Sequence, residues 1–257
     1  MGAALVAGLA RSGSFDVGSV VVVEPDEGRR AELAATHRGL SIVDAPGPGM
    51  LDGRDGGAVL AVKPDVAEVA CRALGAAGAR RVLSVVAGMP AARLEACLPD
   101  AAVVVRSMPN SAALVGAGVS AISGGSRARS SDLDWAERIL GAVGTVVRVP
   151  ERQLDAVTAL SGSGPAYFFV VVESLIEAGV LAGLDRATSR TLATETIRGA
   201  AALLSETGEA PESLRAAVTS PGGTTAAGLR ALEARAVRSA FVEAVTAALE
   251  RSRSLAR

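Results

Sequence analysis

The stretch Arg81–Gly88, with the sequence RVLSVVAG, joins an almost continuous apolar run to a turn of small residues. A strand that is covered on both faces reads as such a run, whereas a strand with one wet face alternates apolar and polar residues. We therefore predict that Arg81–Val86 is a buried strand of a parallel sheet. In such sheets ligands bind beyond the carboxyl ends of the strands, which is where Ala87 and Gly88 follow.

Similar apolar runs recur through the first 150 residues. Further strands are predicted at Ser19–Glu24, Leu40–Val43, Ala58–Val62, Ala102–Arg106, Val119–Ser123 and Thr145–Val149. Helical patterns lie between several of them, at Glu27–Thr36, Asp65–Ala77, Ala91–Leu98 and Ser130–Gly141. This alternation predicts right-handed βαβ units and a largely parallel, doubly wound sheet over residues 1–150.

The pattern changes after Leu154, beyond which no convincing strand is found. Helices are predicted at Pro165–Ala182, Arg186–Glu206, Glu212–Thr219, Gly223–Ala234 and Ala236–Leu255. Residues 151–257 are thus expected to form a second, all-helical domain. Its first long helix carries a broad apolar face that includes Val170, Leu175 and Val180, and this face suits either a core or a dimer interface.

Composition argues against several classes of function. The net charge is −1 and no basic run occurs, so binding to nucleic acid by charge is not expected. The apolar run Met1–Leu9 has no basic segment before it and is soon followed by Arg11, which argues against a signal peptide or a membrane span. We predict a cytoplasmic protein with no membrane partner. Cys71 and Cys97 lack metal-binding spacing and His37 is the only histidine, so no metal site is predicted.

Three predicted strands in succession are followed by small residues, a proline-fixed turn or an amide, as Lys63-Pro64, Ala87-Gly88 and Ser107–Asn110. Such residues let a flat cofactor approach the backbone closely, so we predict a cofactor site at this edge of the sheet. Lys63 is the only lysine of the chain. A backbone contact or a phosphate contact suits its place at a strand end better than a role as general acid.

Glu24 ends the first predicted strand of this chain and bears on the choice of coenzyme. An acid at this place in a dinucleotide-binding sheet accepts hydrogen bonds from a ribose 2′-hydroxyl and repels a 2′-phosphate, which favours NAD. Arg29 and Arg30 lie close enough in sequence to pair with such a phosphate, or they are solvated residues of the next helix. The coenzyme preference therefore stays open.

Two segments of the helical half combine glycine with hydroxyl residues. Ser161–Ala166 (SGSGPA) precedes one predicted helix, and Ser220–Thr225 (SPGGTT) precedes another. Glycines let backbone N–H groups converge, and the amino terminus of a helix adds positive potential. The turn at Ser220–Thr225 is therefore expected to bind a carboxylate. Helix capping alone is the alternative for a single threonine such as Thr224 or Thr225.

Five segments together make the chain resemble the pyrroline-5-carboxylate reductase family along nearly its whole length. They are AVKP at Ala61–Pro64, VAG at Val86–Gly88, RSMPN at Arg106–Asn110, LSGSGPAY at Leu160–Tyr167 and TSPGGTT at Thr219–Thr225. The resemblance implies an α/β Rossmann-type domain followed by an all-α dimerisation domain. It also implies a homodimer or a higher homo-oligomer, since decamers are common in the family.

The activity implied by the resemblance is reduction of 1-pyrroline-5-carboxylate to L-proline, the last step of proline biosynthesis. NADPH or NADH would supply the hydride, with a lean to NADPH. Thr225 would be the catalytic residue that assists protonation of the ring nitrogen, and Val218 would pack against the ring. The implied carboxylate contacts are Ser220, Gly222, Gly223, Thr224 and Thr225. The implied cofactor contacts are Met1, Gly2, Glu24, Ala61, Val62, Lys63, Pro64, Val86, Ala87, Gly88 and Asn110.

The amino terminus departs from the family pattern, which opens with a strand and a Gly-x-Gly-x-Met-Gly turn. Here Met1 and Gly2 match the last two residues of that turn. We hypothesise that translation starts upstream and that Met1 is an internal methionine. The missing strand would lie at the centre of the sheet, so its loss would leave its neighbours unpaired, weaken cofactor binding and lower solubility.

Two alternatives bear on function. A β-hydroxyacid dehydrogenase shares this domain plan but would need a lysine in the helical domain, and no lysine follows Lys63. A non-catalytic remnant that acts as a helical dimerisation module is favoured only by the incomplete amino-terminal turn.

Overall fold

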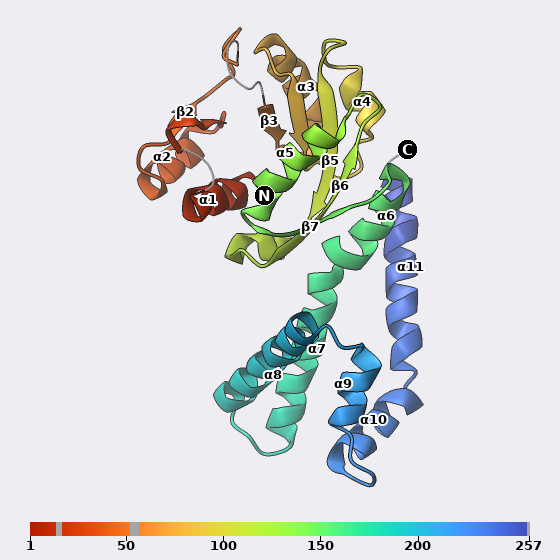
Figure 1. Cartoon of the computed structure of the whole chain (residues 1–257). Coiled ribbons are helices and arrows are strands. Elements are labelled where there is room, and N and C mark those ends of the chain that lie inside the picture. The colour runs from red at the N-terminus through yellow and green to blue at the C-terminus, as the bar shows by residue number, and fades with distance from the viewer. Residues whose placement is uncertain (14–16, 52–56, 256–257) are drawn as a thin grey trace. The chain divides into compact units, whose positions relative to one another are not determined.

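The computed structural model describes residues 1–13, 17–51 and 57–255 of the chain. Contacts divide it into two compact units, which are Met1–Ser163 with Ala248–Arg257, and Gly164–Ala247 (Figure 1). The compact units divide after Ser163, thirteen residues beyond the predicted domain boundary at residue 150. That boundary stays a prediction.

All seven predicted strands are present in the first unit. Five form one sheet in the order β3 (Gly57–Leu60), β4 (Arg81–Ser84), β5 (Val103–Pro109), β6 (Gly118–Gly124) and β7 (Gly144–Arg148). Pairing is parallel except between β5 and β6, which run antiparallel. The connection from β5 to β6 holds only the short 3-10 turn η3 (Ser111–Val115), and this is too short for the crossover that a parallel pair requires.

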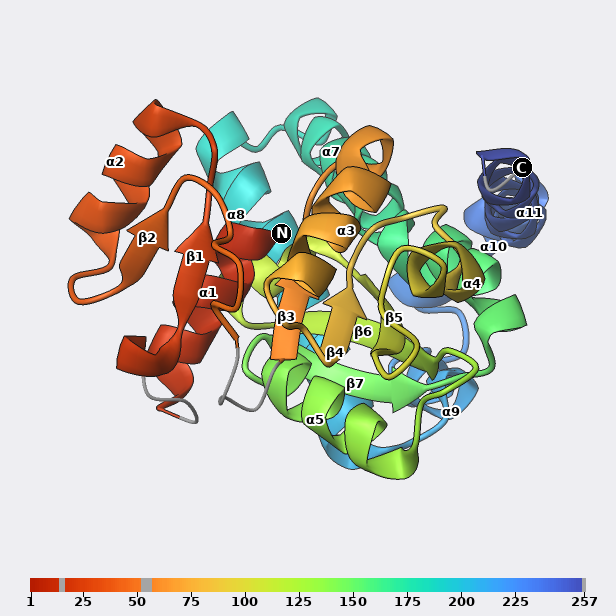
Figure 2. The ribbon, with the colours of Figure 1, turned by 90° about the horizontal axis from the view of Figure 1, so that it is seen from above.

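The remaining strands, β1 (Val21–Val23) and β2 (Ser41–Val43), form a separate parallel pair. Among the described residues no strand pairs with the free edge of β1 or of β3. Figure 2 shows the amino terminus between these two strands. The expectation that neighbouring strands stay unpaired in this chain is therefore confirmed. Val23 of β1 and Val59 of β3 remain 37% and 36% exposed, which is unusual because the strands of parallel sheets are normally buried.

Helices cover both faces of the larger sheet, and successive side chains of β4 point to opposite faces. Val82 packs in one buried cluster with residues of α3 (Ala67–Ala76) and α4 (Ala91–Glu95). Leu83 packs in the other cluster, with residues of α1 (Gly2–Ser12) and α5 (Ser130–Gly141). A fifth helix, α2 (Glu27–Thr36), follows β1.

Cys71 lies in the first of these clusters and is fully buried. Burial raises the pKa of its thiol to about 11, with a smaller contribution from nearby Cys97. The thiol therefore stays neutral and packs as a small apolar group.

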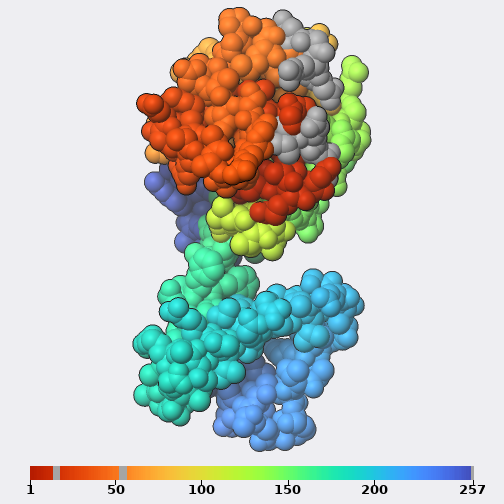
Figure 3. Space-filling model, turned by 90° about the vertical axis from the view of Figure 1, so that its left-hand side faces the viewer, coloured from red at the N-terminus to blue at the C-terminus, as the bar shows by residue number. Residues whose placement is uncertain are grey.

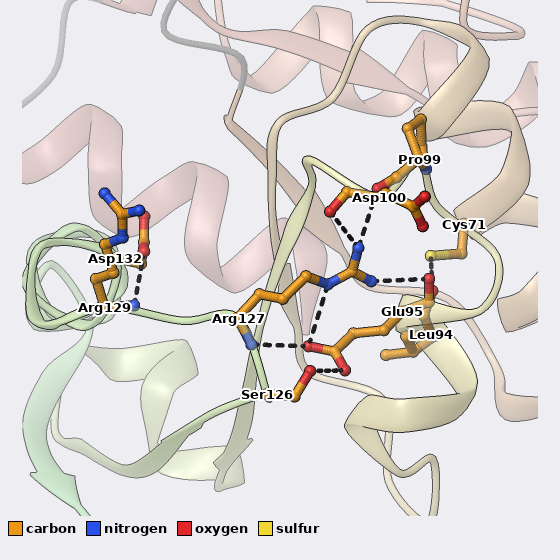
Figure 4. A network of polar contacts seen from close by, with 9 residues as sticks. All are labelled: Cys71, Leu94, Glu95, Pro99, Asp100, Ser126, Arg127, Arg129 and Asp132. Carbon is orange, nitrogen blue, oxygen red and sulfur yellow. Dashed lines mark hydrogen bonds and ion pairs between the residues drawn. The ribbon is translucent and has the colours of Figure 1, made fainter.

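A polar network fastens the segment before α5 to α4 (Figure 4). The buried Glu95 carboxylate accepts a hydrogen bond of 2.8 Å from Ser126 Oγ. The backbone carbonyl of Glu95 accepts another, of 3.1 Å, from Arg127 Nη2. Arg127 Nη1 also donates to the carbonyl oxygen of Asp100, at 2.5 Å. Because the buried carboxylate has hydrogen-bond partners, its desolvation cost is offset and the network is a structural anchor.

A long helical segment begins where the sheet ends. It comprises the 3-10 turn η4 (Glu151–Gln153), α6 (Leu154–Val157), the π turn η5 (Thr158–Gly162) and α7 (Gly164–Leu181). The predicted turn before a helix starting at Pro165 is therefore wrong, because the backbone here is already helical. Ser163 N–H donates to Thr158 O at 2.9 Å, which is the i to i+5 bond of a π turn.

The second unit contains α7, α8 (Arg186–Thr207), α9 (Pro211–Ala217), α10 (Thr224–Ala234) and the first part of α11 (Val237–Leu255). Its described side chains bury little apolar surface, since both hydrophobic clusters lie in the first unit. Phe169 and Val170 of α7 are 62% and 60% exposed. The space-filling view shows an opening between the turquoise residues of α8 and the darker blue residues that follow α9 (Figure 3).

One helix, Glu151–Leu181, is long and apolar enough to cross a membrane, with a mean hydropathy of 1.5 in its most apolar window. Length and composition are the only basis for this finding, and 6% of that window is buried. An apolar helix of this kind needs either lipid or another protein surface to cover it.

Candidate functional site

The predicted cofactor residues of β3 and β4 meet at one edge of the sheet. Ala61–Pro64 follow β3 and are all exposed, while Val86–Gly88 follow the neighbouring parallel strand β4. Val85 N–H donates to Leu60 O at 3.1 Å, so the two segments leave the sheet side by side. Gly2 begins α1 at the same edge, since a Cβ built on it would lie 3.4 Å from that of Ala61. Met1 precedes it and is 42% exposed.

Individual side chains at this edge differ in what they offer a ligand. Val86 is 3% exposed, so a ligand contact there would be with its backbone. Ala87 is exposed, and Gly88 has a φ of 70°, a left-handed conformation that favours glycine. The Lys63 ammonium is exposed, and within residues 1–13, 17–51 and 57–255 it has no hydrogen bond or ion pair. These features fit a dinucleotide that approaches the backbone closely and carries phosphate.

Asn110 follows β5, and its carboxamide is engaged within the first unit. The Oδ1 atom accepts a hydrogen bond of 3.2 Å from Val119 N–H, and the Asn110 N–H donates to Val119 O at 3.2 Å. The side chain thus fixes the turn from β5 into β6. Its amide nitrogen is the atom left to meet a ligand.

Glu24 follows β1 and is surrounded by its own neighbours in sequence. Its Oε1 atom accepts from Asp26 N–H at 3.1 Å, and its Oε2 atom lies 3.6 Å from Arg29 Nε. Arg30 Nη1 instead donates to the carbonyl oxygens of Glu24 and Pro25, at 3.0 and 2.6 Å. Arg30 therefore shapes this turn, whereas Arg29 stands beside the carboxylate with its side chain 64% exposed.

The segment Ser220–Gly223 forms a tight turn in the second unit. Gly223 N–H donates to Ser220 O at 3.0 Å, and Gly222 has a φ of 70°. Pro221 and Gly222 thus occupy the central positions that proline and a left-handed glycine take in a type II turn. A Cβ on Gly223 would lie 3.2 Å from Ser220 O and would overlap the Ser220 hydroxyl unless that side chain rotated.

Helix α10 begins directly after this turn, with Gly223 as its N-cap. Glycine has no side chain to cap the helix, so the first amides of α10 keep no capping partner. Thr224 and Thr225 are exposed, and their hydroxyls make no hydrogen bond to the described part of the chain. Val218, 64% exposed, stands before the turn. Free amides, hydroxyls and the helix dipole together can hold a carboxylate.

The predicted residues thus fall into two groups. Those for the cofactor belong to the first unit, and Val218, Ser220 and Gly222–Thr225 belong to the second. Within the first unit, Gly2, Ala61–Pro64 and Val86–Gly88 lie at one edge of the larger sheet, whereas Glu24 follows β1 of the separate strand pair and Asn110 follows β5. The structure described here contains no group of three or more His, Cys, Asp and Glu side chains that could hold a metal ion.

A cavity of about 670 Å³ lies elsewhere in the first unit, lined by residues that include Arg81, Val103 and Asp132. Arg81 and Val103 begin β4 and β5, so this cavity is at the opposite edge of the sheet from Ala61 and Gly88. Ligands of parallel sheets bind at the carboxyl edge, and the cavity is therefore separate from the predicted cofactor site.

The sequence reasoning missed two features next to the cofactor edge. A Cβ on Gly162 would lie 2.6 Å from Met108 Cε, so the π turn packs against the end of β5. Glu151 accepts hydrogen bonds from Ala91 N–H and from Arg106 Nη1. A glycine within an otherwise helical pattern could have indicated the first contact, whereas nothing local in the sequence indicates the second.

The chain is similar to known proteins over both of its units. Residues 151–255 match the family model described as pyrroline-5-carboxylate reductase dimerisation. The chain is 42% identical to the pyrroline-5-carboxylate reductase of Synechocystis sp., in an alignment that covers 99% of this chain and 94% of that protein.

Two solved structures have the same fold over the length of the chain. The pyrroline-5-carboxylate reductase from Coxiella burnetii has a TM-score of 0.92 and 32% identity, covering 99% of this chain and 94% of that one. The Plasmodium falciparum pyrroline carboxylate reductase, solved with NADP bound, has a TM-score of 0.84 and 29% identity, covering 100% and 95%. Sequence and fold agree over both units, and the chain belongs to the pyrroline-5-carboxylate reductase family.

Proposed function

We propose that this protein reduces 1-pyrroline-5-carboxylate to L-proline with a hydride from NADPH or NADH. The observation that carries the proposal is the turn Ser220–Gly223 at the start of α10, with its uncapped amides and two exposed threonine hydroxyls. It offers what a small substrate with one carboxylate and one ring nitrogen requires. Membership of the family supports the same reaction.

The substrate would bind through its carboxylate to the amides of Thr224 and Thr225, with the Ser220 and Thr224 hydroxyls beside it. Val218 would cover the ring, and the Thr225 hydroxyl would meet the ring nitrogen. A protonated imine needs only positioning and a hydride, so the lack of a histidine or lysine in this unit suits the reaction. Hydride adds to the C=N carbon, and the nitrogen becomes the amine of proline.

The coenzyme would lie along Met1, Gly2, Ala61–Pro64 and Val86–Gly88, with Asn110 toward its nicotinamide end. When bound, the nicotinamide supplies the hydride. Lys63 would meet a phosphate, since its ammonium is exposed at the end of β3. We favour NADPH, because Arg29 stands beside Glu24 and can turn toward a 2′-phosphate.

The protein would act in the cytoplasm as a homodimer or a larger homo-oligomer, of which a decamer is one form. Exposed apolar side chains of α7 support this, since the second unit buries few of its own. A non-catalytic dimerisation module is a second candidate, because the unpaired edges of β1 and β3 interrupt the coenzyme domain.

An assay of both products tests the proposal. The purified chain is given 1-pyrroline-5-carboxylate with NADPH or with NADH, while coenzyme oxidation and proline formation are both measured. We expect the rate to saturate with coenzyme and one proline to form for each coenzyme oxidised. The KM for NADPH should be lower than that for NADH. Binding of neither coenzyme, with dimers still present, would support the dimerisation module instead.

A further inference from the structure

Glu151 joins two segments of the first unit that lie far from it in sequence. It begins η4, directly after Pro150. Its Oε1 atom accepts a hydrogen bond of 2.8 Å from Ala91 N–H and another of 2.7 Å from Arg106 Nη1. The Arg106 side chain is 14% exposed and the Glu151 side chain is 37% exposed, so this ion pair is partly shielded from solvent.

The Ala91 amide ends the loop that carries Val86–Gly88. Ala91 is the first residue of α4, where a helix leaves its amides without an internal acceptor, and the N-cap Pro90 offers no side-chain acceptor. The other end of the loop is held by Val85 N–H, which donates to Leu60 O at 3.1 Å. Glu151 therefore adds a side-chain contact at this end of the loop, where Met89 and Ala91 are also buried.

Arg106 in turn holds Glu151 in place. It lies on β5, where it pairs in register with Ser84 of β4 and Ser123 of β6, so its backbone is fixed in the middle of the sheet. A hydrogen bond between two charged groups is stronger and more directional than one between neutral groups. The carboxylate is thus tied to the sheet on one side and to the first amide of α4 on the other.

We propose that Glu151 is a positioning residue for the coenzyme, which it serves by holding the loop before Ala91. This rests on the proposed function, in which Val86–Gly88 meet the coenzyme. In this proposal Glu151 acts through the loop, and Arg106 acts through Glu151. Loss of the carboxylate lets the loop move, so coenzyme binding weakens while the substrate turn in the second unit is untouched.

Three variants of the full-length protein test this role. In Glu151→Ala we expect the KM for NADPH to rise about tenfold, as befits loss of a charge-assisted hydrogen bond. The KM for 1-pyrroline-5-carboxylate should stay within about twofold of wild type. Glu151→Gln keeps an acceptor oxygen for Ala91 and should recover most of the NADPH affinity. Glu137→Ala, which removes an exposed partner of Arg148, is the matched control and should leave both KM values unchanged.

Hydrogen exchange of the coenzyme-free protein provides a readout that does not depend on turnover. The Ala91 amide should exchange faster in Glu151→Ala than in wild type and at an intermediate rate in Glu151→Gln. Unchanged exchange and an unchanged KM for NADPH in Glu151→Ala would overturn the proposal. So would an equal rise of both KM values in that variant. An inactive wild type would refute the proposed function alone, because exchange and NADPH titration would still decide the role of Glu151.

Discussion

Threonine hydroxyls in this chain differ according to their place in a helix. Thr158, Thr191 and Thr246 each donate to the carbonyl oxygen four residues earlier, at 2.8, 3.1 and 2.8 Å. Thr224 and Thr225 are in the first turn of α10, where no helical carbonyl lies four residues before them. Their hydroxyls are therefore left for a ligand, which is a physical reason to assign them to the substrate.

Replacing Thr225 by alanine tests this assignment. We expect kcat to fall by about 10- to 100-fold, as for loss of one hydrogen bond to a charged group, with little change in stability. Thr225→Ser keeps the hydroxyl and should retain most of the rate. Thr246→Ala, which removes a hydroxyl satisfied within α11, is the control. A wild-type kcat in Thr225→Ala, measured under saturating coenzyme, would refute the role.

At the level of elements, helix ends with a local signal were predicted well. Helix α2 was placed at Glu27–Thr36, and Asp26 caps it by accepting from Arg29 N–H at 2.8 Å. Helix α8 likewise starts after Asp185, whose carboxylate accepts from Thr188 N–H at 2.9 Å. The Thr188 hydrogen bonds also lower the pKa of Asp185. Such caps lie within four residues and can therefore be recognised in a sequence.

Other features depend on contacts that the sequence does not show. Helix α1 was not predicted, because its N-cap Met1 makes no side-chain cap and its first turn has no acid. The π turn Thr158–Gly162 resembles a helix break, since glycines and serines usually end helices. The bonds of Glu151 span 60 and 45 residues. Site residues were placed by family resemblance, and their roles stay predictions.

The fit of α1 against the end of α5 yields a second prediction. A Cβ at Gly8 would overlap Val143 Cγ1 and lie 2.9 Å from Ala142 O. Gly8→Ala should therefore push α1 outward and lower the free energy of unfolding by about 1–3 kcal/mol. The control is Gly141→Ala, since a Cβ there meets nothing within 4 Å. Urea denaturation measures the free energy of unfolding of both variants. Equal values for Gly8→Ala and Gly141→Ala would contradict close packing of α1 at Gly8.

At the scale of the whole molecule, the interrupted sheet leads to a third prediction. The free edges of β1 and β3 expose backbone groups that a strand between them would pair. A designed extension before Met1, with a Val-rich strand of about five residues and a glycine turn, should raise the melting temperature and tighten NADPH binding. A Gly/Ser extension of equal length is the control. Equal effects of the two extensions would show that the gap accepts no strand.

The exposed apolar face of α7 leads to a fourth prediction. Val170 is 60% exposed on this helix, and an interface between copies would bury it. Val170→Glu should therefore shift the homo-oligomer toward monomer, because an unpaired charge is costly to bury. Val147→Glu, on β7 of the first unit and 44% exposed in the wild type, should leave the assembly intact. Light scattering after size-exclusion chromatography measures both, and an unchanged mass for Val170→Glu would contradict the interface.

The exposed Lys63 at the end of β3 is the only lysine of the chain. An amine-directed fluorophore would therefore find one lysine side chain, and it stands at the proposed coenzyme edge. Bound NADPH should shield this amine, so the rate of Lys63 acylation should fall as NADPH is added, with peptide mapping used to separate Lys63 from the α-amino group. Labelling of Lys63 can therefore give the dissociation constant for NADPH without an engineered cysteine.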